Sequence, residues 1–213
     1  MLRIVFLLLS SCLFFSCFNK KEKPIPLPYY NAPDFTPIFI TEVNDINTKI
    51  THKIADFSFL NQDSILVTQN IFKNKIHVAN FIFTTCGSIC PVMTKNFKIV
   101  GDQFLNDTNV VLLSYSVTPW IDKPSKLKKY IAANSIKNAN WEFLTGDRAS
   151  IYTLARQSYF AEEDLGFSKD SKEFLHTEHF ILVDRSGRIR GIYNGTLSLE
   201  MKQLIDDINN LEN

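Results

Sequence analysis

One stretch constrains the fold of this chain most, because its hydrophobic period changes from that of a strand to that of a helix within a few residues. Residues 75–83 (KIHVANFIF) are rich in β-branched and aromatic side chains and end in an apolar run, which predicts a buried central strand. From Cys90 onward, apolar residues recur at spacings of four, three and four, which indicates one face of a helix. These residues are Met93, Phe97, Val100 and Phe104. A buried strand that leads directly into an amphipathic helix is typical of an α/β fold.

The rest of the chain continues this alternation of strands and helices. The turn sequence Asp184-Arg185-Ser186-Gly187 separates two apolar runs and predicts a hairpin near the end of the chain. The fold class predicted from the whole pattern is an α/β sandwich with a central mixed sheet, mostly parallel at its core, flanked by helices. The further strands are expected over 53–60, 64–68, 110–116, 180–184 and 189–193, and the further helices over 123–133, 147–159 and 197–211.

The first residues have the features of an export signal. Arg3 precedes an apolar stretch over residues 4–15, and a polar run follows. This stretch is too short for a membrane-spanning helix but suits the hydrophobic region of a signal peptide. Cys12 and Cys17 each follow a serine and resemble the lipidated cysteine of a bacterial lipobox. The length of the stretch favours Cys17, with Cys12 as the alternative. A plain cleaved signal or an uncleaved anchor would also place the domain outside the cytoplasm.

Composition and proline content suggest how the chain is divided. We expect a signal over residues 1–17, a proline-rich tether and lead-in over 18–49, and one domain over 50–213. With 45% hydrophobic residues in 213, the chain can bury the core of one such domain. The 23 basic and 22 acidic residues nearly cancel, so the chain lacks the basic footprint of a nucleic-acid-binding protein. The expected location is the bacterial periplasm, on the inner or outer membrane through an N-terminal lipid.

Two cysteines remain once the signal is set aside. Cys86 and Cys90 are four residues apart, and a disulfide that closes so short a loop contributes little stability. They lie where the central strand ends and the helix begins, at the edge where α/β folds place their sites. A helix N-terminus favours the thiolate. Such a pair can form a labile disulfide, reduce a substrate or bind a soft metal, and spacing alone does not choose among these roles.

The histidines differ in what their positions predict. His176 precedes an apolar strand by a few residues, so we expect it in a loop that can approach the cysteines. His179 starts that strand with the opposite parity, so only one of the two is expected to face the pair. His77 lies within the apolar strand and is expected to be structural, and His52 carries no prediction. Met93 is expected to pack in the core because it shares the apolar face of its helix.

Three segments carry a resemblance to a known family: NFIFTTCGSICPVMTKNF, LTGD and HTEHFILVDRSGRIRGIYNG. Over about residues 50–213 the chain resembles the Sco/SenC family of copper-binding assembly factors for cytochrome c oxidase, which have a thioredoxin-like fold. The resemblance implies that Cys86, Cys90 and His176 bind copper(I) and copper(II). It also implies delivery of copper to the CuA centre in the copper-bearing subunit of a terminal oxidase, rather than enzymatic catalysis. Other copper chaperones or a thiol reductase are further expected partners.

The chain departs from the family pattern at two places, and a second function remains open. Gly87 stands where the family usually has proline, and Thr118-Pro119 where it usually has Asp-Pro. The second change removes a carboxylate, so no acidic residue is assigned a role. The alternative is an extracytoplasmic thiol–disulfide oxidoreductase that keeps the cysteines of the oxidase copper site reduced. The C-x3-C spacing and the lack of a proline after Pro124 favour metal binding. A peroxidase and a purely structural disulfide are less favoured.

Overall fold

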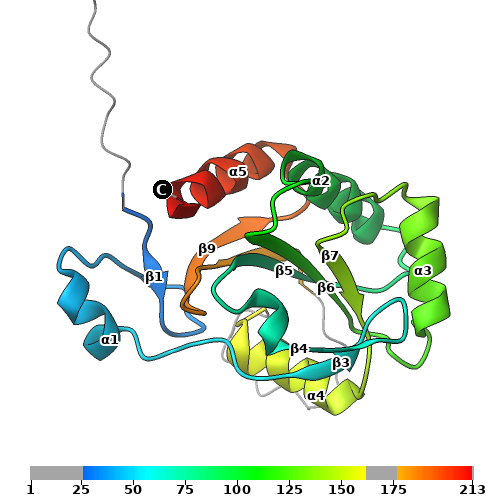
Figure 1. The fold of residues 1–213 in the computed structure, drawn as a ribbon, viewed down its shortest axis with the longest axis horizontal. Helices are drawn as coiled ribbons and strands as arrows, with labels where there is room; N and C mark the ends of the chain where they lie inside the picture. The colour runs from blue at the N-terminus through cyan, green and yellow to red at the C-terminus, as the bar shows by residue number, and fades with distance from the viewer. Residues whose placement is uncertain (1–25, 162–176, 213) are drawn as a thin grey trace, which may run out of the picture.

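A computed structural model describes residues 26–161 and 177–212 and shows a mixed α/β architecture. Seven strands form one sheet in the order β2-β1-β9-β8-β5-β6-β7, and β3 and β4 form a separate hairpin (Figure 1). The strands of the large sheet are β1 (Tyr29–Tyr30), β2 (Pro37–Ile38), β5 (Ile76–Ile82), β6 (Val110–Ser116), β7 (Trp141–Leu144), β8 (His179–Val183) and β9 (Ile189–Asn194). The hairpin consists of β3 (Ser58–Leu60) and β4 (Leu66–Thr68).

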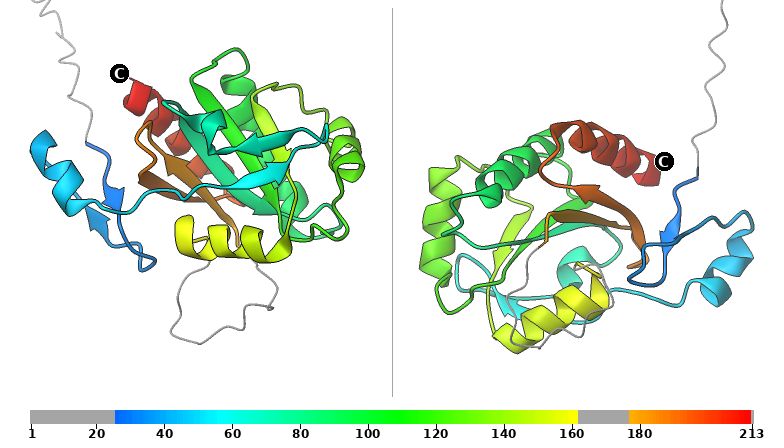
Figure 2. Two further views of the ribbon diagram at one scale, coloured as in Figure 1. Left: turned by 60° about the horizontal axis from the view of Figure 1, so that its bottom comes forward. Right: turned by 180° about the vertical axis from the view of Figure 1, so that it is seen from behind.

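Helices cover both faces of the large sheet. In Figure 1, α2 and α5 lie on one face, α4 and the β3–β4 hairpin lie on the other, and α3 lies beside β7. Figure 2 shows the same layers from two further directions. The helices are α1 (Ile46–Lys49), α2 (Ile89–Gln103), α3 (Pro124–Ala133), α4 (Arg148–Thr153) and α5 (Ser198–Glu212). Short 3-10 turns precede α1 and β5, at Val43–Asp45 and Gln69–Phe72, and a π-helical turn, Leu154–Ser158, continues α4.

The sheet is mixed, as predicted, but its parallel part is smaller than expected. Only β5, β6 and β7 are parallel neighbours, and every other adjacent pair is antiparallel. The prediction of a mostly parallel core was therefore wrong for four of the six adjacent strand pairs. One of these pairs is the β8–β9 hairpin, whose tight turn at Asp184–Gly187 returns the chain along the sheet without a crossover helix.

Two apolar clusters fill the space on either side of the sheet. One lies toward α2, α3 and α5 and contains Met93, Phe97 and Phe180; the other lies toward α4 and the hairpin and contains Phe57, Tyr115 and Tyr159. Along β8, successive side chains alternate between the two clusters, as the period of a strand requires. The face to which a residue of β8 points can therefore be read from its parity.

Four local predictions need correction. Only Ser58–Leu60 of the stretch 53–60 pairs as a strand, because the preceding residues run beside α4, where the backbone N–H of Ala55 donates to the Ser158 hydroxyl. The next strand begins at Leu66 rather than at residue 64, since Ser64 has a left-handed backbone conformation with φ of 62°. Strand β7 was missed because its four residues are too few to show a period. Part of the lead-in joins the sheet, because β1 pairs with β9.

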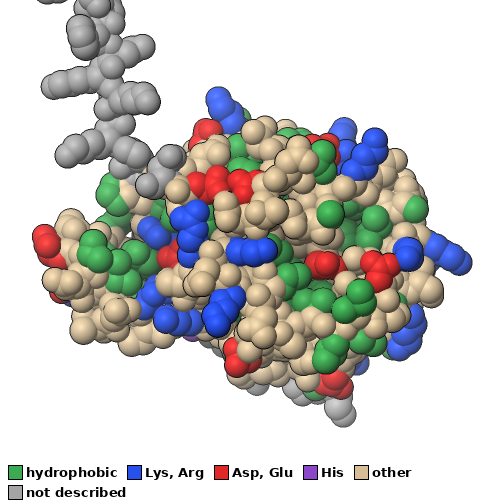
Figure 3. Space-filling model, viewed as in Figure 1, with side chains coloured by type: hydrophobic (Ala, Val, Ile, Leu, Met, Phe, Trp, Pro, Cys, Tyr) green, Lys and Arg blue, Asp and Glu red, His purple; other side chains and the backbone are tan. Residues whose placement is uncertain are grey.

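Among residues 26–161 and 177–212, no helix has the length and apolar character needed to cross a membrane. Basic, acidic and apolar side chains are interspersed over the face shown in Figure 3.

Candidate metal or redox centre

The candidate site is built on the turn that joins β5 to α2. Strand β5 is buried along its whole length, so its carboxyl end has a fixed position in the sheet. Cys86 lies in the turn, where its backbone N–H donates to the Phe83 carbonyl over 3.2 Å. Cys90 lies in the first turn of α2 and is only 3% exposed, whereas Cys86 is half-buried. The turn thus presents one accessible thiol directly above a second, buried one.

The Cys86 sulfur takes the place of a helix cap. Ser88 is the N-cap residue of α2, but its side chain makes no capping hydrogen bond. Instead, the backbone N–H of Cys90 donates to the Cys86 sulfur over 3.4 Å. The first N–H groups of a helix have no partner within the helix, and they favour a negative charge placed against them. The geometry therefore stabilises a thiolate at Cys86.

The two thiols have opposite shifts in acidity. Partial burial alone would raise the pKa of Cys86, but hydrogen bonds from the backbone of Cys90, Ser88 and Ile89 and from the Cys90 thiol bring it below its ordinary value. Burial raises the pKa of Cys90 to about 12. A hydrogen bond with the Phe83 backbone opposes this shift, and the adjacent Cys86 and the charge of Asp122 add to it. At neutral pH, Cys86 is thus the better nucleophile and Cys90 is a protonated thiol.

Asp122 is a buried carboxylate near the pair that sequence analysis missed. It follows the turn after β6, is fully buried, and accepts hydrogen bonds from Thr84, Ser116 and Thr118. The sequence predicts no acidic residue at the site because Thr118 replaces the usual aspartate, yet a carboxylate four residues further along the chain reaches the same end of the sheet. Its position after a buried parallel strand next to the cysteine strand was the available signal.

Tyr130 is a second residue near the pair that sequence analysis missed. Its hydroxyl, on α3, shares a 2.7 Å hydrogen bond with the hydroxyl of Thr94 on α2. Burial raises the pKa of Tyr130, the Thr94 hydrogen bond opposes this shift, and the nearby charges of Cys90, Cys86 and Asp122 add to it. The electrostatic coupling identifies Tyr130 as a neighbour of the pair. The sequence predicts that Tyr130 lies on a helix, but it does not predict that this helix packs near the cysteine pair.

The described histidines lie away from the pair or in the core. His77 is fully buried in β5, where its Nε2 contacts the Tyr159 hydroxyl at 3.1 Å, so the structural role predicted for it is confirmed. His179 has the parity of the β8 residues that point toward α4, and its ring packs edge-on against Phe35. His179 therefore lies on the sheet face opposite to α2. The ring Nε2–H of His52 donates to the Ser158 carbonyl over 2.7 Å.

Other predicted positions fall outside the described residues or in the core. His176, Cys12 and Cys17 lie outside residues 26–161 and 177–212. Met93 is fully buried in the cluster on the α2 side of the sheet, which confirms core packing. Within the described part of the chain, no three or more His, Cys, Asp and Glu side chains cluster in a way that could hold a metal ion. Of the three expected copper ligands, the structure thus describes the two thiols, Cys86 and Cys90.

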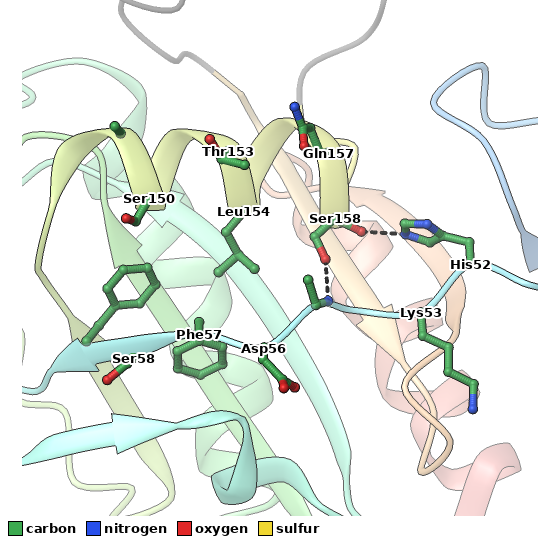
Figure 4. Close-up of a pocket in the computed structure, with 13 residues that line it drawn as sticks. His52, Lys53, Asp56, Phe57, Ser58, Ser150, Thr153, Leu154, Gln157 and Ser158 are labelled. Carbon is green, nitrogen blue, oxygen red and sulfur yellow. Dashed lines mark hydrogen bonds between the residues drawn. The ribbon is translucent and has the colours of Figure 1, made fainter.

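A groove elsewhere on the molecule holds neither cysteine. It has a volume of about 880 Å³ and lies between residues 52–59 and the helical segment 149–158 (Figure 4). The two walls are joined where Ser158 accepts from His52 at its carbonyl and from the Ala55 N–H at its hydroxyl. The groove lies on the face of the sheet that α4 covers, whereas Cys90 belongs to α2 on the opposite face. It therefore does not extend the cysteine site.

The comparisons with known proteins agree with this architecture. The SCO1/SenC family model matches residues 47–212. A SCO1 protein homolog from Bacillus subtilis (strain 168) is 32% identical over 165 residues, which cover 76% of this chain and 84% of that protein. The crystal structure of a SCO1/SenC family lipoprotein from Bacillus anthracis str. Ames superposes with a TM-score of 0.67 at 28% identity, covering 76% of this chain and 96% of that one.

Two further solved structures bear on the site. BsSco, described as having a disulfide switch and as a member of the Sco family of cytochrome c oxidase assembly proteins, gives a TM-score of 0.64 at 31% identity over 75% of this chain and 93% of its own. Bradyrhizobium japonicum ScoI with copper bound gives a TM-score of 0.58 at 25% identity over 74% and 98%. These likenesses confirm the thioredoxin-like fold expected from the sequence. The chain, which the family model matches over more than half its length, belongs to the SCO1/SenC family.

Proposed function

We propose that this protein is a copper metallochaperone that binds copper through Cys86, Cys90 and His176. The observation that carries the proposal is the thiol pair at the α2 N-terminus, in which Cys86 is half-exposed and its thiolate is stabilised by backbone N–H groups. Thiolates are soft ligands that select copper(I), and imidazole accepts either oxidation state. Copper is the cargo of this site, and the partial exposure of Cys86 suits transfer to an acceptor by ligand exchange.

The third ligand is proposed from the sequence and is supported by the sheet topology. His176 directly precedes Thr177, where the described chain resumes. Strand β8 runs antiparallel to β5, with Ala79 opposite Ile181, so the start of β8 lies at the end of the sheet where β5 leads to Cys86. A ligand contributed from just before β8 therefore fits the site, whereas His179 points to the other face of the sheet.

The proposed acceptor is the CuA centre of a terminal cytochrome c oxidase. The support is family membership together with the similarity to BsSco, a protein of cytochrome c oxidase assembly, and to a copper-bound ScoI. We further propose that the protein is held in the bacterial periplasm by a lipid on Cys17, or on Cys12. The similarity to a SCO1/SenC family lipoprotein supports this anchoring.

A second candidate function is thiol–disulfide exchange with the cysteines of the oxidase copper site. The asymmetry of the pair favours it, since an accessible thiol of lowered pKa above a buried thiol of raised pKa is the arrangement that dithiol reductants use. Cys86 would attack the target disulfide, and Cys90 would then release the target by forming the Cys86–Cys90 disulfide. Both functions use the same two sulfurs, and reduction of the target would prepare it to receive copper.

The histidine assignment can be tested with two matched variants. His176→Ala should weaken copper(II) binding and alter the thiolate-to-copper(II) absorption of the loaded protein, because it removes the only nitrogen ligand. His179→Ala, three residues away on the opposite sheet face, should leave that absorption unchanged. If the two variants exchange these outcomes, or if His176→Ala leaves the absorption and the copper(II) affinity unchanged, His176 is not a ligand.

A further inference from the structure

Asp122 is the most heavily hydrogen-bonded carboxylate near the cysteines. One carboxylate oxygen accepts from the Thr84 backbone N–H at 3.1 Å, the Ser116 hydroxyl at 2.7 Å and the Thr118 hydroxyl at 2.9 Å. The other accepts from the Thr84 hydroxyl at 2.5 Å. The side chain is fully buried, and no Lys, Arg or His of the described chain forms an ion pair with it. Four donors thus compensate the burial of this charge.

The donors come from two neighbouring strands. Ser116 ends β6 and Thr118 follows it, whereas Thr84 follows the end of β5 and lies two residues before Cys86. Asp122 itself is held in place by its backbone N–H, which donates to the Thr118 carbonyl over 2.9 Å. The carboxylate therefore attaches the beginning of the cysteine turn to a rigid turn on the adjacent parallel strand.

The remainder of the cysteine turn has few other attachments of this kind. Gly87 has no atom within 4 Å of the position where a β-carbon would stand, so the middle of the turn is open. Before it, the Cys86 N–H bonds to Phe83, and after it, the Cys90 N–H bonds to the Cys86 sulfur. Thr84, held at both its backbone and its hydroxyl, is the last point fixed from outside the turn before the first sulfur.

We propose that Asp122 is the positioning residue of the cysteine pair, holding the turn through Thr84 so that the Cys86 sulfur stays against the N-terminus of α2 beside Cys90. A fixed turn keeps the two sulfurs at a high effective concentration with respect to each other. Asp122 touches neither copper nor substrate in this role. The inference concerns the geometry of the pair, so it holds for either proposed function and is tested without copper.

The test is the equilibrium of the pair with glutathione. In the oxidation, Cys86 and Cys90 form a disulfide and lose two protons and two electrons, and one glutathione disulfide is cleaved to two glutathione thiols. The full-length protein in detergent is equilibrated in glutathione buffers, alkylated, and quantified by peptide mass spectrometry. Asp122→Ala should lower the equilibrium constant for disulfide formation by about tenfold, which corresponds to about 30 mV for this two-electron couple.

Two variants distinguish a positioning effect of Asp122 from an effect of its negative charge and from a general loss of stability. Asp122→Asn should stay within about threefold of the wild-type constant, because its amide oxygen can accept three of the four hydrogen bonds and the Thr84 hydroxyl can accept from its NH2 group. Asp184→Ala removes a partly buried carboxylate, which accepts from Ser186, Arg188 and Arg190 at the far end of the sheet. It should change the global stability but not the constant.

Each outcome decides the proposal. An unchanged constant in a folded Asp122→Ala protein overturns it, as does an equal shift in Asp184→Ala. A shift of Asp122→Asn as large as that of Asp122→Ala would assign the effect to charge instead of position. If Asp122→Ala does not fold, Thr84→Val keeps the carboxylate and removes one donor, and it should lower the constant by about threefold. No change in Thr84→Val would then reject the proposal.

Discussion

The two cysteines are chemically unequal although they are only four residues apart. Cys86 is half-exposed and accepts a hydrogen bond from the helix N-terminus, whereas Cys90 is buried beneath it. The sequence predicted the first of these properties, since a cysteine before a helix is stabilised as a thiolate. It did not predict the second, because the burial of Cys90 depends on tertiary packing. That burial, with a smaller contribution from the charge of Asp122, raises the pKa of Cys90.

This inequality predicts unequal rates of alkylation. In the reduced protein at pH 7.5, Cys86 should react with iodoacetamide at least about tenfold faster than Cys90, because the thiolate is the reacting species. The rate at Cys86 should level off below pH 9, the ordinary pKa, while the rate at Cys90 should keep rising toward its pKa of about 12. Rates are measured by peptide mass spectrometry. Equal rates in the folded protein would contradict the asymmetry, and the urea-denatured protein is the control in which they should converge.

The burial of His77 leads us to expect that the protein loses stability in acid. Burial lowers its pKa from 6.5 to about 3 in the folded protein. Between these values the unfolded chain binds a proton that the folded chain does not, so the stability falls as the pH falls from 6.5 toward 3, by about 1.4 kcal/mol per pH unit for this group. His77→Phe keeps a ring to stack on Phe72. Urea unfolding gives the free energy of unfolding at each pH across this range. Its dependence on pH should be weaker in the variant by the contribution of one proton, about 1.4 kcal/mol per pH unit. An unchanged pH dependence would show that His77 is not the group responsible.

At the scale of elements, long periodic segments could be predicted and short ones could not. Helices α2, α3 and α5 and strands β5 and β6 appear where the apolar period indicated them. Strand β7 has four residues, and residues 53–57 alternate like a strand but pack against α4 without pairing. Both differences arise from tertiary contacts, which a period of a few residues does not encode.

The turn between β5 and α2 carries a prediction at this scale. Gly87 does not need its conformational freedom, since its backbone is not in the left-handed region and no atom would contact an added β-carbon. Gly87→Ala should therefore stabilise the protein by about 0.4–1 kcal/mol, mainly by restricting the unfolded chain. Gly146→Ala is the contrasting variant, because its β-carbon would stand 2.6 Å from the Phe59 ring, and it should destabilise. Urea unfolding measures both, and a destabilised Gly87→Ala would show that the turn requires glycine.

For the whole molecule, the N-terminal segment is part of the folded domain from about residue 27. Arg190 of β9 donates to the Leu27 and Pro28 carbonyls, its guanidinium lies 3.8 Å from the centre of the Tyr29 ring, and it pairs with Asp184 at 3.3 Å. The proline content of this region suggested only an extended tether. The attachment could not be predicted, because it depends on an arginine more than 160 residues away in the sequence.

Removal of the Arg190 side chain should detach residues 27–30 from β9. Arg190→Ala leaves Asp184 without its cation and should cost about 3 kcal/mol of stability. It should also make the bonds near residues 27–30 sensitive to limited proteolysis. Arg185→Ala, in the adjacent exposed turn, is the control and should leave the cleavage pattern unchanged. Protection of residues 27–30 in Arg190→Ala would show that the pairing of β1 with β9 alone holds the segment.

If the Cys86–Cys90 pair is a copper site, as we propose, it should bind copper(I) tightly, and a titration measures this. The reduced full-length protein is titrated anaerobically against a competing chelator, with Cys86→Ser and Cys90→Ser as paired variants. We predict one tightly bound equivalent in the wild-type protein and its loss in both variants, because each removes one of two soft ligands. Binding no tighter than that of a generic dithiol, or an unchanged affinity in Cys90→Ser, would contradict the copper site and leave thiol–disulfide exchange as the function of the pair.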